Sequence, residues 1–168
     1  MEFRVHTPPF PPSAELIARV RDLRRAVWAG EMNHDFDERV DLESVHCCAY
    51  ENDVLIAASR VTVCTRPDVL VDYAPLSELL DGWPSPFALL TRLVVGAEFR
   101  RRGIAAQLDR MRVEAGRELG AATLVVSPRS GRPRRMAELG FQRAAIVPGV
   151  LLPEIQRDVW IASSAMPR

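Results

Sequence analysis

The sequence predicts a single mixed α/β (α+β) domain covering residues 1–168, and three observations support this fold class. A chain of 168 residues that is 48% hydrophobic is long enough for one substantial core and short for two. The apolar run Ala88–Val95 predicts a buried strand, and a helix is indicated by apolar positions spaced from 104 to 119. Ala122–Ser127 is again rich in β-formers, so the two strands are expected to pair in parallel across the helix.

The segments on either side are expected to extend the sheet. Glu2–His6 alternates like a short edge strand, and four prolines follow it. Ser13 is a typical N-cap for a helix that ends near Gly30. Residues 31–43 carry six acids and are expected to form a loop. The other expected elements are strands Val45–Tyr50 and Val54–Val63 around an Asn52-Asp53 turn, a short helix at Leu76–Leu80, a helix from Pro133 to Gly140, and a closing hairpin of Phe141–Val147 with Asp158–Ala162.

The composition argues against several classes of function. The 22 basic and 22 acidic residues balance, so the net charge gives no reason to expect nucleic acid as a partner. Every basic residue is an arginine, which excludes a catalytic lysine. Three cysteines without a C-x-x-C pair, and no long apolar run, predict a cytoplasmic protein that does not enter the membrane. His34, Asp35 and Asp37 match no standard zinc spacing, so no metal is expected.

The most informative stretch is the turn between the central strand and the long helix. It reads Arg100-Arg101-Arg102-Gly103-Ile104-Ala105, which places three guanidinium groups and a glycine where the first amides of a helix lack intrahelical partners. Those amides, with the helix dipole, attract a phosphate-bearing ligand. Gly103 allows the ligand to approach the backbone, and the small Ala105 leaves the next turn uncrowded. The turn therefore predicts an anion site at the start of the helix.

The pattern Arg100-x-x-Gly103-x-Ala105 between a strand and a helix, with Leu139-Gly140-Phe141 further on, resembles the diphosphate-binding signature of the GNAT acyltransferase superfamily. The resemblance implies a GNAT fold, with a mixed sheet of about six to seven strands, about four helices and splayed central parallel strands. It implies transfer of an acetyl or other acyl group from acetyl-CoA or another acyl-CoA, the co-substrate, to a small-molecule or peptide amine. The donor contacts it implies are Leu93, Val94, Val95, Arg100, Arg101, Arg102, Gly103, Ile104, Ala105 and Arg129.

The side chains that this family often uses for catalysis are missing. Met136 stands where many members have a tyrosine that protonates the leaving thiolate, and Arg129 stands where an asparagine is common. Ser127, Tyr50 or a bound water could protonate the thiolate instead. An acid of the 31–43 segment, Asp41 or Glu43, could accept the proton of the amine. Weak side-chain catalysis is tolerable because positioning alone lowers the barrier.

A second resemblance, to the acyl-homoserine-lactone synthases, comes from Arg24-x-x-x-Trp28, Asp41, Arg60 and Thr91-Arg92-Leu93-x-Val95. It implies an acyl carrier protein as the donor. Trp28, Arg60 and Arg92 are then candidates for substrate binding.

Two further hypotheses follow from the same residues. Arg60 and Arg92 lie on strands expected to be buried, where an unpaired charge is unfavourable, so they are expected to form a network with Asp41 and Glu43. The missing tyrosine and asparagine also leave room for a non-catalytic sensor that binds acyl-CoA. The sequence leaves open the amine acceptor and whether the chain is a monomer or a homodimer.

Overall fold

The computed structural model describes residues 1–8, 13–28, 38–66, 68, 76–128, 132–148 and 156–163. The chain divides into two compact units, one formed by Met1–Thr62 with Thr91–Ala115 and the other by Val63–Leu90 with Gly116–Arg168. The prediction of a single domain stays a prediction. Within the described ranges, no helix has the length and apolar character needed to cross a membrane.

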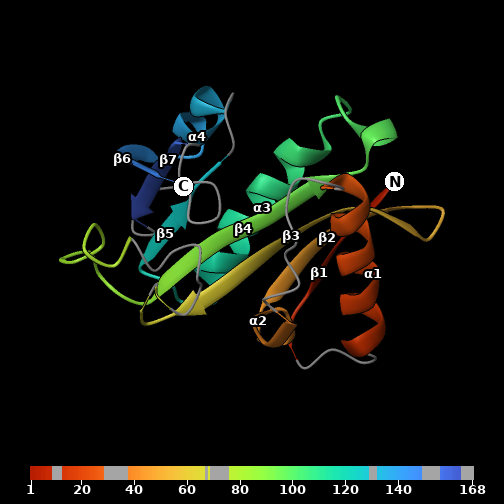
Figure 1. Cartoon of the computed structure of the whole chain (residues 1–168), viewed down its shortest axis with the longest axis horizontal. Coiled ribbons are helices and arrows are strands. Elements are labelled where there is room, and N and C mark those ends of the chain that lie inside the picture. Colours follow the sequence, from red (N-terminus) through yellow and green to blue (C-terminus); the bar gives the residue numbers. More distant parts are fainter. Residues whose placement is uncertain are drawn as a thin grey trace. The chain divides into compact units, whose positions relative to one another are not determined.

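The described residues form a mixed seven-stranded sheet with strand order β1-β2-β3-β4-β5-β7-β6 and four α-helices (Figure 1), which confirms the predicted fold class. The strands are β1 (Glu2–His6), β2 (Val45–Glu51), β3 (Val54–Cys64), β4 (Phe87–Val95), β5 (Thr123–Val126), β6 (Gln142–Pro148) and β7 (Gln156–Ser163). The helices are α1 (Ser13–Val27), α2 (Glu38–Glu43), α3 (Ile104–Glu118) and α4 (Pro133–Glu138).

The first unit is organised around the antiparallel hairpin of β2 and β3. Asn52 and Asp53 make its turn with φ of 50° and 62°, the left-handed conformation that suits these residue types. Strand β1 pairs with β2 in register from Glu2↔Tyr50 to His6↔His46. Helix α1 packs its apolar face on this sheet, where Val20 joins a core cluster that includes Val94 of β4.

The second unit contains the parallel pair that the sequence predicted. Strand β4 pairs with β5 from Phe87↔Thr123 to Leu90↔Val126. Strand β7, rather than the earlier β6, lies next to β5, and β6 pairs with β7 to close the sheet. Helix α4 begins at Pro133, and Gly140 ends it with a φ of 86°.

Two expectations about local structure are wrong. Part of the expected acidic loop, Glu38–Glu43, is helix α2, whereas residues 29–37 lie outside the described residues. Leu76–Leu80 forms turns with one helical-type bond, from the Leu80 N–H to the Leu76 carbonyl at 2.9 Å. A segment this short gains too few hydrogen bonds to propagate a helix.

The three cysteines are free thiols. Cys47 and Cys48 are buried in β2, and Cys64 is half-buried at the end of β3. Burial raises the pKa of Cys47 to about 11, that of Cys48 to about 12 and that of Cys64 to about 11. All three are therefore protonated at neutral pH.

Candidate active site

The α3 entry loop, Arg100–Ala105, follows β4 through a tight turn. Gly96 donates its N–H to the Ile56 carbonyl of β3 at 2.9 Å, and the 3₁₀ turn η4 (Ala97–Phe99) comes next. A Cβ at Gly96 would meet the Phe99 ring at 3.0 Å and the Ile56 carbonyl oxygen at 3.3 Å. Glycine at position 96 thus lets the chain turn directly from the strand into the loop.

Gly103 directly precedes helix α3 and adopts a left-handed conformation. Its φ is 78°, and the helical hydrogen bonds begin with the Gln107 N–H to the Gly103 carbonyl at 3.1 Å. The N–H groups of Ile104 and Ala105 therefore have no acceptor within the helix. A Cβ built at Gly103 has nothing within 4 Å, so a ligand can approach the backbone there. The geometry fits the anionic diphosphate of a coenzyme A group.

The three arginines of the loop differ in what they contact. Arg102 pairs with Glu51 at 2.6 Å and lies 5.5 Å from the centre of the Phe99 ring. Arg100 donates its Nε–H to the Val95 carbonyl at 3.3 Å. Arg101 is exposed and has a φ of 61°. Two of the three guanidinium groups are thus engaged by the protein.

Strand β4 pairs with β5 only along its first half. Its ladder with β5 covers Phe87–Leu90, whereas the strand continues to Val95. Arg92 has a φ of 54°, which is unusual for a non-glycine residue inside a strand and marks an irregularity in the pleat. Val94 is 2% exposed and packs toward α1, while Leu93 is half-buried. The predicted donor contacts at positions 93–95 thus lie on the part of β4 beyond its ladder with β5.

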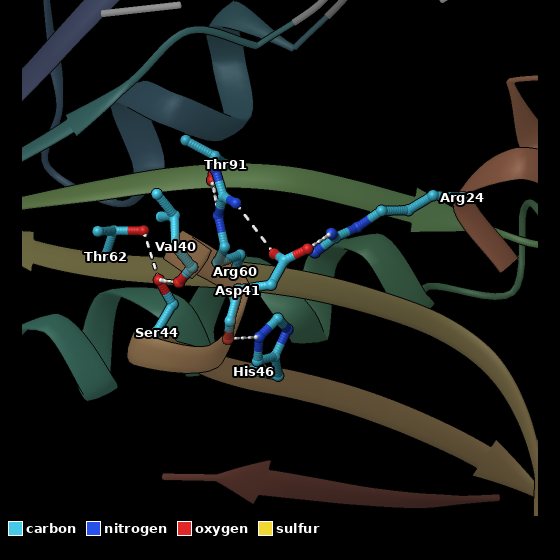
Figure 2. Close-up of polar contacts among 8 residues, drawn as sticks. All are labelled: Arg24, Val40, Asp41, Ser44, His46, Arg60, Thr62 and Thr91. Carbon is cyan, nitrogen blue, oxygen red and sulfur yellow. Dashed lines mark hydrogen bonds and ion pairs between the residues drawn. The ribbon is translucent and has the colours of Figure 1, made fainter. Parts of the chain in front are cut away.

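A second group of polar residues, here called the arginine cluster, consists of Arg24, Asp41 and Arg60. Figure 2 shows the Arg24 side chain reaching from α1 to the Asp41 carboxylate of α2, with Arg60 of β3 at the other carboxylate oxygen. Arg24 Nη1 donates to Asp41 Oδ2 at 2.7 Å, and Arg60 Nη1 donates to Asp41 Oδ1 at 2.9 Å. Arg60 also donates its Nε–H to the Thr91 hydroxyl of β4 at 3.0 Å. The three members are 7%, 2% and 1% exposed, respectively.

Charge pairing keeps the carboxylate of this cluster ionised. Burial raises the pKa of Asp41, but the Arg24 and Arg60 guanidinium groups lower it by more, so the net shift is downward. Burial likewise lowers the pKa of Arg24, to about 10, against the attraction of Asp41. Arg24 is still protonated at neutral pH. A carboxylate with a lowered pKa and both oxygens engaged is a weak proton acceptor, so these contacts favour a positioning role for Asp41 over that of a base.

Helix α2 is fixed to the sheet by the residues that follow Asp41. Ser44 donates to the Val40 carbonyl at 2.6 Å and bonds the Thr62 hydroxyl at 2.8 Å. His46 is fully buried, with its Nε2 at 2.8 Å from the Asp41 carbonyl. Burial lowers the pKa of His46 to about 4, so the ring is neutral at pH 7. Because a carbonyl only accepts, the proton of the ring is on Nε2.

The structure confirms one part of the predicted charge network and corrects another. Arg60 pairs with Asp41 as expected, but Glu43 lies on the exposed side of α2 and bonds Arg39 at 3.2 Å. Glu43 is outside the network because it lies on the exposed side of the short helix α2, whereas Asp41 faces the sheet. The second arm of the network is Arg24, which was not among the residues predicted to form it.

The remaining predicted site residues have separate surroundings. The Tyr50 hydroxyl bonds His6 Nε2 at 3.0 Å, and burial raises the pKa of Tyr50 to about 12. The Ser127 Oγ is buried and has no hydrogen-bond partner in the described part of the chain. Trp28 is half-buried against the core cluster of α1. Arg129, and the residues His34, Asp35 and Asp37 considered for a metal, lie outside the described residues.

Comparison with known proteins agrees with this geometry. The profile of the Acetyltransferase (GNAT) family matches residues 13–141, whereas no curated protein sequence matches. Among solved structures, Escherichia coli ElaA is 16% identical, covers 97% of this chain and 100% of its own, and has a TM-score of 0.68. FeeM, an N-acyl amino acid synthase from uncultured soil microbes, is 14% identical, with coverages of 98% and 95% and a TM-score of 0.76. An aminoglycoside 6'-N-acetyltransferase complexed with coenzyme A is 15% identical, with coverages of 100% and 99% and a TM-score of 0.67.

These structural likenesses, all at low identity, establish the fold. The family match goes further because it covers most of the chain and includes the α3 entry loop. The chain therefore belongs to the GNAT acetyltransferase family and is an acyltransferase that uses acyl-CoA as its co-substrate.

Proposed function

We propose that this protein is an N-acyltransferase that moves an acetyl or other acyl group from acyl-CoA to the amine of a small molecule or peptide. The observation that carries the proposal is the start of α3, where Gly103 leaves open space beside amides without helical acceptors. Such a site suits the diphosphate of the donor, because the amides and the helix dipole favour an anion without any rearrangement.

The main chain of Leu93 and Val95 is the proposed contact for the pantetheine arm. Strand β4 continues past its ladder with β5 at these residues, and an extended arm could add to the strand by main-chain hydrogen bonds. In the reaction, the amine nitrogen bonds to the thioester carbonyl carbon, the carbon–sulfur bond breaks, the thiolate leaves, and the amine loses a proton.

Two groups are proposed for the proton on the thiolate. The Ser127 hydroxyl is the stronger candidate because its buried Oγ has no hydrogen-bond partner in the described part of the chain. Tyr50 is weaker, since its hydroxyl already bonds His6 and its pKa is raised to about 12. For the amine proton, Glu43 stays a prediction. The contacts of Asp41 favour an amine that arrives already deprotonated.

The donor site is tested by Gly103→Glu, with Gly120→Glu as a matched control. Both glycines are exposed, have φ near 80°, and have nothing within 4 Å of an added Cβ, so the two changes strain the backbone equally. Gly103→Glu is expected to weaken acetyl-CoA binding about 100-fold, because like charges near 4 Å apart repel by several kcal/mol. Calorimetric titration measures the affinity, and circular dichroism checks the fold. Equal affinities for the two variants would overturn the proposed site.

Turnover separates the proposed enzyme from its rivals. Thiol release from acetyl-CoA is measured with polyamines, amino acids, aminoglycosides and peptide amines as acceptors. We expect release with at least one acceptor. Saturable binding without release on any of them would favour the sensor. A strong preference for acyl carrier protein over acyl-CoA as the donor would favour a carrier-dependent synthase.

A further inference from the structure

The two unpartnered N–H positions of Arg24 point to a ligand. Arg24 is 93% buried, and its Nη1 is taken by Asp41, but its Nε and Nη2 have no hydrogen-bond partner among the described residues. Buried guanidinium N–H groups without an acceptor are strongly unfavourable, so a native structure seldom keeps them unless a water, an ion or a ligand completes them.

The two unpartnered nitrogens, Nε and Nη2, are also the pair of donors that fits a carboxylate. Nε and Nη2 lie on one edge of the planar guanidinium and present parallel N–H groups, which is the arrangement that binds two oxygens of one carboxylate. Asp41 occupies only the opposite nitrogen, Nη1, at 2.7 Å, and holds the guanidinium plane in place. Arg60 fixes Asp41 from the other side, so the free edge of Arg24 is held in one orientation.

The arginine cluster contacts β4, the strand proposed to bind the donor, through Arg60 and the Thr91 hydroxyl. The Trp28 N–H bonds the Arg24 carbonyl at 2.9 Å, and Trp28 packs one turn further along against the cluster that contains Val94. In the arginine cluster, Arg24 is linked through Asp41 to Arg60, and Arg60 bonds the Thr91 hydroxyl of β4. A group bound to Arg24 would therefore be held by a cluster that is itself anchored to β4.

On the basis of the proposed function, we propose that the amine acceptor carries a carboxylate, which the Nε–Nη2 edge of Arg24 binds. The acceptor is thus an amino acid or a related amino carboxylate, and the product is an N-acyl amino acid. A carboxylate suits the site better than a phosphate does, because each added negative charge is repelled by Asp41, which shares the same guanidinium.

The test compares matched acceptors and matched variants. Amino acids of each side-chain class are assayed beside their carboxamides, with acetyl-CoA as donor, in the wild type, Arg24→Lys and Arg25→Lys. Lysine at position 24 keeps a cation beside Asp41 but loses the two-donor edge. Arg25 is the control because it is the next residue of α1 and its side chain is 57% exposed.

The wild type and Arg25→Lys are expected to prefer the acid over the amide by 10- to 100-fold in kcat/KM, on the order of one charge-assisted pair of hydrogen bonds. In Arg24→Lys this ratio is expected to fall to about 1, with the KM for acetyl-CoA unchanged. Equal use of acid and amide by the wild type, or a ratio that survives Arg24→Lys, would overturn the inference.

A binding measurement keeps the inference separate from the proposed function. Ligand-observed NMR measures the binding of free amino acids to the three proteins without any turnover. Amino acid binding that is lost only in Arg24→Lys supports the carboxylate site even if no acyl transfer occurs. If acyl transfer to amines is observed but no amino acid binds or reacts, the carboxylate site is refuted while the acyltransferase stands.

Discussion

The arginine cluster and the α3 entry loop both concentrate guanidinium groups, but they use them in opposite ways. In the cluster, Arg24 and Arg60 are buried and converge on one carboxylate. In the loop, the arginines are exposed, and Arg102 and Arg100 turn to Glu51 and to a carbonyl of the protein itself. The anion site proposed for the loop consists of the backbone around Gly103.

This difference predicts which side chains can be substituted in each region. A site built from backbone amides tolerates changes of side chain, provided that the glycine keeps its conformation. A buried ion cluster tolerates very little, because removing one member leaves another charge buried and unpaired. The predictions below test that contrast, beginning with the largest effect.

Asp41→Asn should strongly destabilise the protein. It removes the charge that two buried guanidinium groups share, so the free energy of unfolding is expected to fall by about 3–5 kcal/mol. Urea denaturation followed by circular dichroism measures the change. The control is Glu43→Gln two residues along the same helix, where an exposed side chain should alter stability by less than about 0.5 kcal/mol. Similar values for the two variants would show that the cluster is not the anchor described here.

His46 should make stability depend on pH. Its folded pKa is about 4 against 6.5 for the free side chain, so the unfolded chain binds the proton first as the pH falls. The contribution is fully present above pH 6.5 and is lost between pH 6.5 and 4, up to about 3 kcal/mol. The lowered pKa of Asp41 adds a separate loss below its ordinary value of 3.8.

Denaturation at a series of pH values isolates the histidine when His46→Gln is run beside the wild type. Glutamine keeps an N–H donor for the Asp41 carbonyl but does not titrate. The two curves should diverge from one another only in the window from pH 6.5 to 4. Parallel curves throughout that range would mean that the ring is not held neutral.

Arg102→Gln should have the smallest effect. Its pair with Glu51 is exposed and screened by solvent, so no resolvable change in the denaturation midpoint is expected. The affinity for acetyl-CoA should change by less than about 3-fold, because main-chain amides are the proposed contacts of the anion. A loss of acetyl-CoA affinity as large as that expected for Gly103→Glu would show that the loop, like the arginine cluster, depends on its arginine side chains.

The sequence was sufficient to predict the central part of the fold. A buried strand, a glycine and a helical repeat of apolar residues act locally, so β4, the loop at Gly103 and α3 could be placed from the pattern alone. The pairing of β7 with β5 could not be placed, because a hairpin can add to a sheet by either strand.

The missed features depend on tertiary contacts. Helix α2 is only six residues long, and Ser44 and His46 fix it to the sheet, so its own sequence carries little helical signal. Arg24 did carry a signal. It follows Val20 by four residues and precedes Val27 by three, which places a charged residue on the apolar face of α1, where a buried partner is required.

The raised thiol pKa values of the three cysteines have a practical consequence. At pH 7.5, a thiol with a pKa of about 11 is ionised in roughly one molecule in three thousand, whereas about one in ten ordinary thiols is a reactive thiolate. A disulfide dye added to a reaction mixture should therefore react with the thiol of the released coenzyme A and only very slowly with the cysteines of the enzyme. We therefore expect that thiol release by this protein can be followed continuously without substituting its cysteines.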